Sequence, residues 1–158
     1  MLHEYSRMEL LIGEEGLKRL KNARVAVFGI GGVGSYVTEA LARCGIGTLI
    51  LVDNDQVSLT NLNRQLIALH STIGQAKTEV MKDRIRDINP EIVVHTYETF
   101  FMEDTAELFD FSSYDYVVDA VDTVTAKILL IEMAAAAGTP VISSMGTGNK
   151  LDSGRFEI

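Results

Sequence analysis

The chain has 158 residues, of which 47% are hydrophobic and two are proline, and this composition suits one folded domain spanning 1–158 with a sizeable core. Its formal net charge of −8 argues against general affinity for nucleic acids, because phosphate binding draws mainly on lysine and arginine. The sequence contains neither an apolar run long enough for a membrane helix nor the apolar stretch of a signal peptide near its start, so we expect a cytoplasmic protein without membrane contacts.

The first half of the chain alternates between helical periods and apolar runs. An amphipathic helix is predicted over 14–21, and we expect its apolar stripe to lie in the core, with a dimer interface as the alternative. A strand over 24–28, a helix over 32–44 and a strand over 48–52 follow and form a β-α-β unit. The single cysteine, Cys44, excludes an internal disulfide, and we expect it to be a buried structural thiol.

The alternation continues in the second half. A helix over 75–88 is stopped by Asn89-Pro90, because the residue before a proline disfavours helical backbone. The later predicted elements are a strand over 92–96, a short helix over 105–109, a strand over 116–119, a helix over 123–137 ending at Gly138, and a strand over 140–144. This order predicts an α/β fold, a Rossmann-like doubly wound and mainly parallel sheet with helices on both faces and an extra N-terminal helix. Because 156–158 alternate like the start of another strand, we expect a chain truncated at its C-terminus.

Four glycines, Gly29, Gly31, Gly32 and Gly34, stand between the first predicted strand and a helix. In this context glycines let phosphates approach backbone N–H groups at a helix N-terminus, so a nucleotide site is predicted. The alternative is that they only tighten a turn. Asp53 ends the next strand, where an acidic side chain can accept hydrogen bonds from a ribose. To this point, a non-catalytic Rossmann module that binds NAD or another nucleotide fits equally well.

The segment after the second strand distinguishes these possibilities. From Asp53 to Gln65 it has the pattern DxDxVxxxNLNRQ, and a GxxK pattern follows at Gly74–Lys77. Together these stretches resemble the adenylation motif of the ubiquitin-activating-enzyme superfamily, the group that includes the MoeB, ThiF and HesA proteins. The resemblance implies an enzyme that uses ATP to adenylate a carboxylate.

By this resemblance Arg64 and Lys77 neutralise the triphosphate as pyrophosphate leaves. The chemistry agrees, because attack of a carboxylate on the α-phosphorus needs cations rather than a nucleophilic side chain. The alternatives are a surface ion pair for Arg64 and a solvated helix lysine for Lys77. The implied cofactor-binding residues are Gly29, Gly31, Gly32, Gly34, Asp53, Asp55, Asn61, Arg64, Gln65 and Lys77.

Two further residues gain roles from the resemblance. The stretch from Asp119 to Asp122 is similar to a strand-end motif whose second aspartate helps to hold Mg²⁺, so Asp122 is the candidate metal ligand. Alternatively, Asp122 caps the following helix, while Asp119 faces the adenine or only closes its strand. Arg7 lies where homodimeric relatives place an arginine that reaches the γ-phosphate of the partner subunit, which implies a homodimer; an ordinary surface arginine is the alternative.

Among the branches of the superfamily, the chain most resembles the tRNA threonylcarbamoyladenosine dehydratases, the TcdA or CsdL group, notably over 144–150. This implies adenylation of the threonylcarbamoyl carboxylate of a tRNA, followed by ring closure with loss of AMP. Any tRNA contact would need surface outside this acidic chain. The alternative substrate is the C-terminus of a ubiquitin-like sulfur-carrier protein. The three histidines, His3, His70 and His95, match no catalytic spacing.

Overall fold

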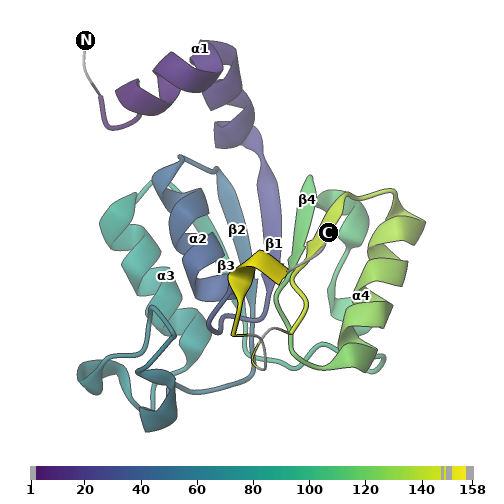
Figure 1. Cartoon of the computed structure of the whole chain (residues 1–158). Coiled ribbons are helices and arrows are strands. Elements are labelled where there is room, and N and C mark those ends of the chain that lie inside the picture. Colours follow the sequence, from purple (N-terminus) through teal and green to yellow (C-terminus); the bar gives the residue numbers. More distant parts are fainter. Residues whose placement is uncertain (1–2, 147, 149–150, 156–158) are drawn as a thin grey trace.

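A computed structural model describes residues 3–146, 148 and 151–155. Its centre is a five-stranded sheet in the order β3-β2-β1-β4-β5, in which every neighbouring pair is parallel (Figure 1). The strands are β1 (Arg24–Phe28), β2 (Thr48–Val52), β3 (Val93–Tyr97), β4 (Tyr116–Asp119) and β5 (Val141–Ser143). Since β2 and β4 flank β1, the strand order reverses there, which confirms the predicted doubly wound sheet.

Helices cover both faces of the sheet. They are α1 (Ser6–Asn22), α2 (Gly34–Arg43), α3 (Lys77–Ile88) and α4 (Val124–Ala137). Side chains alternate along β1, so that Val25 and Val27 belong to the core beside α2 and α3, whereas Ala26 and Phe28 belong to the core beside α4. Figure 1 shows α2 and α3 on one side of the sheet and α4 on the other. None of the described helices is long and apolar enough to cross a membrane.

The N-terminal helix differs most from its prediction. It begins well before residue 14 and contains a break at Gly13, where the backbone is not helical (φ 73°). Leu20 packs against the core, but no residue of α1 is buried, and Leu10 and Leu11 are 86% and 83% exposed. The expectation that the apolar stripe belongs to the core therefore holds only for the end of α1 that precedes β1.

Most other differences are shifts of one or two residues. The strands β1, β2 and β4 have the predicted bounds, and α4 ends at Gly138 in the left-handed conformation. The short helix predicted over 105–109 is a 3-10 turn, Ala106–Leu108. Cys44, expected to be buried, is partly exposed because it follows the last turn of α2. The strand start suggested at 156–158 lies outside the described residues.

The turn from β1 to α2 depends on glycine at two positions. Gly29 has a positive φ of 89°, and its N–H donates to the carbonyl oxygen of Val52 at 2.8 Å. A Cβ atom on Gly34 would lie 1.7 Å from the carbonyl oxygen of Gly29. The first turn of α2 can therefore pack this closely against the end of β1 only when residue 34 has no side chain.

Gly34→Ala should lower the free energy of unfolding by about 3 kcal/mol, because the added methyl group overpacks backbone that cannot give way. The matched control is Gly32→Ala, where the nearest atom to the new Cβ would be the Arg64 Cγ at 3.5 Å and the change should stay within about 1 kcal/mol. Urea titration followed by circular dichroism measures both. Equal stabilities of the two variants would show that the close contact is not required.

Candidate functional site

A cavity of about 660 Å³ opens at the carboxyl ends of β1, β2 and β4. This is the position where the strand order reverses, the usual ligand site of doubly wound sheets. The predicted site residues that line it are Gly29, Gly31, Gly32, Asp53, Asp55, Asn61, Arg64, Gln65, Lys77 and Asp122. Two predicted site residues do not line the cavity. Gly34 packs against the backbone of Gly29, and Arg7 is an exposed residue of α1.

A smaller cavity, of about 370 Å³, lies at the opposite ends of β1, β2 and β3. Its lining includes Tyr5, Lys21 and Glu91 and none of the predicted site residues. The candidate site is therefore the larger cavity.

Asp53 joins the end of β2 to the glycine turn. One carboxylate oxygen accepts the N–H of Ile30 at 2.6 Å, and the other accepts the N–H of Asp55 at 2.8 Å. Only 9% of the side chain is exposed, and this burial raises the pKa of the Asp53 carboxyl above its ordinary value, although both hydrogen bonds and the nearby Lys77 oppose the shift. Each carboxylate oxygen has two lone pairs, so each can accept a second hydrogen bond.

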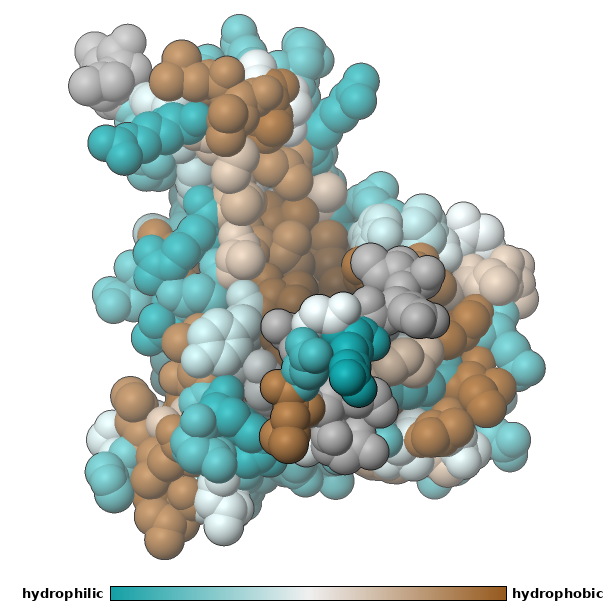
Figure 2. Space-filling view, viewed as in Figure 1, coloured by the Kyte–Doolittle hydropathy of each residue, from teal (hydrophilic) through white to brown (hydrophobic). Residues whose placement is uncertain are grey.

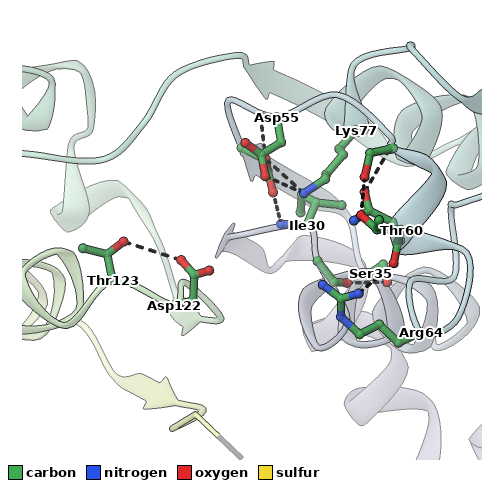
Figure 3. Close-up of polar contacts among 12 residues, drawn as sticks. Ile30, Ser35, Asp55, Thr60, Arg64, Lys77, Asp122 and Thr123 are labelled. Carbon is green, nitrogen blue, oxygen red and sulfur yellow. Dashed lines mark hydrogen bonds and ion pairs between the residues drawn. The ribbon is translucent and has the colours of Figure 1, made fainter. Parts of the chain in front are cut away.

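Lys77 supplies a buried positive charge to the same end of the cavity. It is the first residue of α3 and is only 4% exposed, so it is not a solvated helix lysine. Its Nζ lies 2.7 Å from the Asp55 Oδ2 and 4.0 Å from the Asp53 Oδ1 (Figure 3). Two carboxylates thus hold this ammonium group beside the glycine turn.

Arg64 is an exposed cation on the other side of the turn. Its guanidinium donates to the carbonyl oxygen of Thr60 and to the Asn63 Oδ1, both at 3.1 Å, and within the described residues no carboxylate pairs with it. The surface ion pair considered as its alternative role is therefore not seen there. The segment that carries Arg64 is held by Asn61, whose Oδ1 accepts the N–H of Ser58 at 3.0 Å.

Two further residues lie where the glycine turn meets the segment that carries Arg64. The Ser35 hydroxyl, at the start of α2, donates to the carbonyl oxygen of Gly31 at 2.6 Å and accepts the N–H of Leu66 at 3.3 Å. Gln65 is 7% exposed, and its Oε1 has no hydrogen-bond partner in the part of the chain that the structure describes. The glycine turn and the Arg64 segment are consequently packed as one unit with an unused acceptor at their junction.

Asp122 forms a separate wall of the cavity. Figure 3 shows it apart from the group around Lys77 and Arg64. The N-cap residue of α4 is Thr123, so Asp122 does not cap this helix. Among the described residues, the Asp122 carboxylate accepts one side-chain hydrogen bond, a long one of 3.5 Å from the Thr123 hydroxyl. No cluster of three metal-ligating side chains occurs among the described residues, and the Asp122 carboxylate is exposed.

Two features at or beside the cavity were not predicted from the sequence. Thr99, Phe100 and Phe101, which follow β3, line the cavity, and no motif marked them. Lys127 was also not predicted: it is buried and pairs with Asp119 at 3.0 Å, and Asp119 is buried at the end of β4 and does not line the cavity. The only available signal was one lysine within an apolar helix.

Curated relatives match all or most of the chain. The tRNA threonylcarbamoyladenosine dehydratase of Bacillus subtilis is 54% identical over 158 residues, which are 100% of this chain and 62% of that protein. The enzyme of the same name from Escherichia coli is 42% identical over 148 residues, 94% of this chain and 55% of that protein. The adenylyltransferase and sulfurtransferase UBA4 of Vanderwaltozyma polyspora is 40% identical over 139 residues, 87% of this chain and 31% of that protein. The chain thus spans somewhat more than half the length of the dehydratases.

Solved structures agree with these relatives. The crystal structure of the E. coli tRNA N6-threonylcarbamoyladenosine dehydratase TcdA in complex with ATP has a TM-score of 0.92 and 41% identity, covering 96% of this chain and 63% of that chain. The structure of E. coli MccB with AMPCPP and MccA has a TM-score of 0.79 and 33% identity, covering 89% and 44%. The family model of the ThiF family matches residues 5–155. Because this match covers nearly the whole chain, including the glycine turn and the buried Lys77, the chain belongs to the ThiF family.

Proposed function

We propose that this chain is the ATP-binding, adenylating part of a cytoplasmic tRNA threonylcarbamoyladenosine dehydratase. The observation that carries the proposal is the gathering of Lys77, Arg64 and Asp53 around the glycine turn of one cavity. A hydride-transfer site does not need the two cations, whereas a site that transfers AMP from ATP to a carboxylate needs them to stabilise the leaving phosphates. Full coverage by a dehydratase at 54% identity favours this branch.

In this proposal the cavity receives ATP along its length. The phosphates lie over Gly31 and Gly32, beside the N-terminus of α2, where backbone N–H groups favour anions. The ribose hydroxyls donate to the remaining lone pairs of Asp53. The adenine lies beyond it against the segment 99–101, in which Phe100 is 40% exposed and can contact a planar base.

The chemistry follows from the charges. The substrate carboxylate attacks the α-phosphorus and pyrophosphate leaves, while Arg64 and Lys77 stabilise the charge that develops on the leaving phosphates. Lys77 has three N–H donors, so it can bind a phosphate oxygen while it still contacts Asp55. In threonylcarbamoyladenosine the adenylated side chain then closes its own ring and AMP departs, so no covalent intermediate with the protein is needed.

Asp122 fits the ligand set of Mg²⁺. This ion is commonly held by one or two carboxylates together with substrate phosphates, not by a cage of protein ligands. Asp122 is an exposed carboxylate on the cavity wall that forms no ion pair among the described residues, which matches that pattern. Asp122 would hold the ion, which would neutralise charge on the phosphates when bound.

The substrate proposed is tRNA, and the net charge of −8 requires basic surface from outside this chain. The second candidate is the C-terminus of a ubiquitin-like sulfur carrier, which the same cations would serve. The adenylyltransferase relative matches at 40% identity over 87% of the chain, so the dehydratase is preferred.

A homodimer completes the proposal. Arg7, Leu10 and Leu11 occupy neighbouring positions on α1, and the two leucines are among the most exposed apolar residues of the chain. Figure 2 shows apolar side chains gathered on this helix. A two-fold dimer would bury them and bring Arg7 toward the γ-phosphate in the partner's cavity.

Isothermal titration with ATP and Mg²⁺, run against NAD, tests nucleotide choice. We expect ATP to bind and NAD not to bind, and Arg64→Ala to weaken ATP about tenfold, since a charged hydrogen bond contributes roughly 1.5 kcal/mol. Arg86→Ala, which changes an exposed arginine of α3 outside the cavity, is the control and should bind ATP like the wild type. NAD binding that is indifferent to Arg64 would instead identify a non-catalytic dinucleotide module.

Asp122→Asn should abolish most of the gain in ATP affinity that Mg²⁺ provides, because a neutral amide is a weaker ligand for a hard cation. ATP affinity measured in EDTA should stay within about twofold of wild type, since the change removes no phosphate-binding cation. The same Mg²⁺-dependent gain in both proteins would exclude Asp122 as the ligand.

Mixed dimers test Arg7. Arg7→Ala should weaken ATP but not AMP, which lacks the γ-phosphate. When Arg7→Ala and Arg64→Ala chains are co-refolded in equal amounts, about a quarter of the sites should regain wild-type ATP affinity, because half of the dimers are mixed and one site in each combines intact residues. If titration of the mixture finds no restored sites, Arg7 does not act across a dimer.

A further inference from the structure

A second buried ion pair lies on the β4 and β5 side of the cavity. The side chains of Lys127 and Asp119 are 7% and 0% exposed, and the Lys127 Nζ lies 3.0 Å from the Asp119 Oδ2. The same Nζ donates to the carbonyl oxygen of Ser144 at 2.6 Å, and the Ser143 hydroxyl donates to the same carboxylate. One ammonium group thus joins α4 to the ends of two strands.

Both segments that leave this ion pair form walls of the cavity. Asp119 accepts the N–H of Val121 at 3.1 Å, which holds the turn that leads to Asp122. Ser144 donates its N–H to the backbone carbonyl of Asp119 at 2.9 Å and leads directly into Met145 and Gly146, which line the cavity. Lys127 therefore contacts the residues from which both walls begin.

Stability alone does not account for a charge at this position. Removing two charges from water costs several kcal/mol per ion, and an apolar pair of similar volume is often as stable. The other inward positions of α4, Ala126, Leu130 and Ala134, are all apolar. A methionine at residue 127 would suit such surroundings, but it could not hold the Ser144 carbonyl.

We propose that Lys127 is a positioning residue that sets the acceptor side of the site. This rests on the proposed function, in which ATP occupies the glycine turn, Arg64, Lys77, Asp53 and the segment 99–101. The walls that remain are the Asp122 turn and the segment from Ser144, and the carboxylate to be adenylated must approach the α-phosphorus past them. Lys127 keeps these walls in place and does not itself touch ATP.

Hydrogen–deuterium exchange by mass spectrometry tests the positioning role without turnover. In Lys127→Met the amides of Val121 and of 144–146 should exchange at least tenfold faster than in wild type, while those of the glycine turn stay unchanged, and Lys127→Arg should restore most of the protection. Lys82→Met, at a lysine of α3 outside the cavity, is the control. Unchanged exchange in both segments, or equally faster exchange throughout the chain, would overturn the proposal. If Lys127→Met does not fold, the double variant Asp119→Asn/Lys127→Met, which leaves no unpaired charge, replaces it.

Kinetics then separate this role from nucleotide binding. In a chain of the full length of the dehydratases, with tRNA that carries threonylcarbamoyladenosine, Lys127→Met should lower kcat/KM for tRNA at least tenfold and leave the Kd of ATP within twofold. A parallel loss of ATP affinity would contradict an acceptor-side role. A wild-type protein that binds no ATP would refute the proposed function, whereas the exchange result would still decide whether Lys127 holds the two walls.

Discussion

The hydrogen bond from the Ile30 N–H to the Asp53 carboxylate is the interaction on which the site depends. It holds the glycine turn against the end of β2, and the same carboxylate fixes the backbone of Asp55, which binds Lys77. The turn is also packed closely against the first turn of α2, because Gly34 leaves no room for a side chain beside the carbonyl oxygen of Gly29. A ligand that meets this turn thus finds donors that are already oriented, which lowers the entropic cost of binding.

The electrostatics of the carboxyl edge follow a repeated pattern. Lys77 is the first residue of α3 and Lys127 lies in the first turns of α4, where the helix dipole disfavours cations. Each is buried and each is paired with aspartate at the end of a strand or just beyond it. These carboxylates offset the cost of burying the lysines. The exposed Arg64 is the cation of the cavity lining that has no carboxylate partner among the described residues, so an anionic ligand could pair with it directly.

The ThiF family match and the fold both identify the cavity at the carboxyl ends of β1, β2 and β4 as the candidate site. Relatives with different names, a tRNA threonylcarbamoyladenosine dehydratase and an adenylyltransferase and sulfurtransferase, align with the part of the chain that carries the glycine turn, Arg64 and Lys77. This part of the cavity lining therefore lies in the region that both kinds of relative share. In the proposed function, the carboxylate to be adenylated approaches past the other two walls of the cavity. These walls are the Asp122 turn and the segment after β5.

The sequence alone was sufficient for the sheet and for grouping many of the residues that line the cavity. The strands β1, β2 and β4 match their predicted bounds because each is a continuous apolar run ended by glycine or aspartate. Local patterns suffice there, since a strand covered on both faces must be apolar along its length. The glycines, Asp53, Arg64 and Lys77 could be grouped because they lie at strand ends and in contiguous motifs.

Only the tertiary structure decided which charges are buried and what they contact. Lys77 is enclosed by Asp55, and Lys127 meets Asp119 and Ser144, through the packing of helices against strands that are distant in sequence. The exposure of α1 was likewise decided by the tertiary structure. Its apolar periodicity does not reveal that no residue of this helix is buried. Burial and ion pairing are properties of contacts between elements, whereas sequence periodicity describes one element at a time.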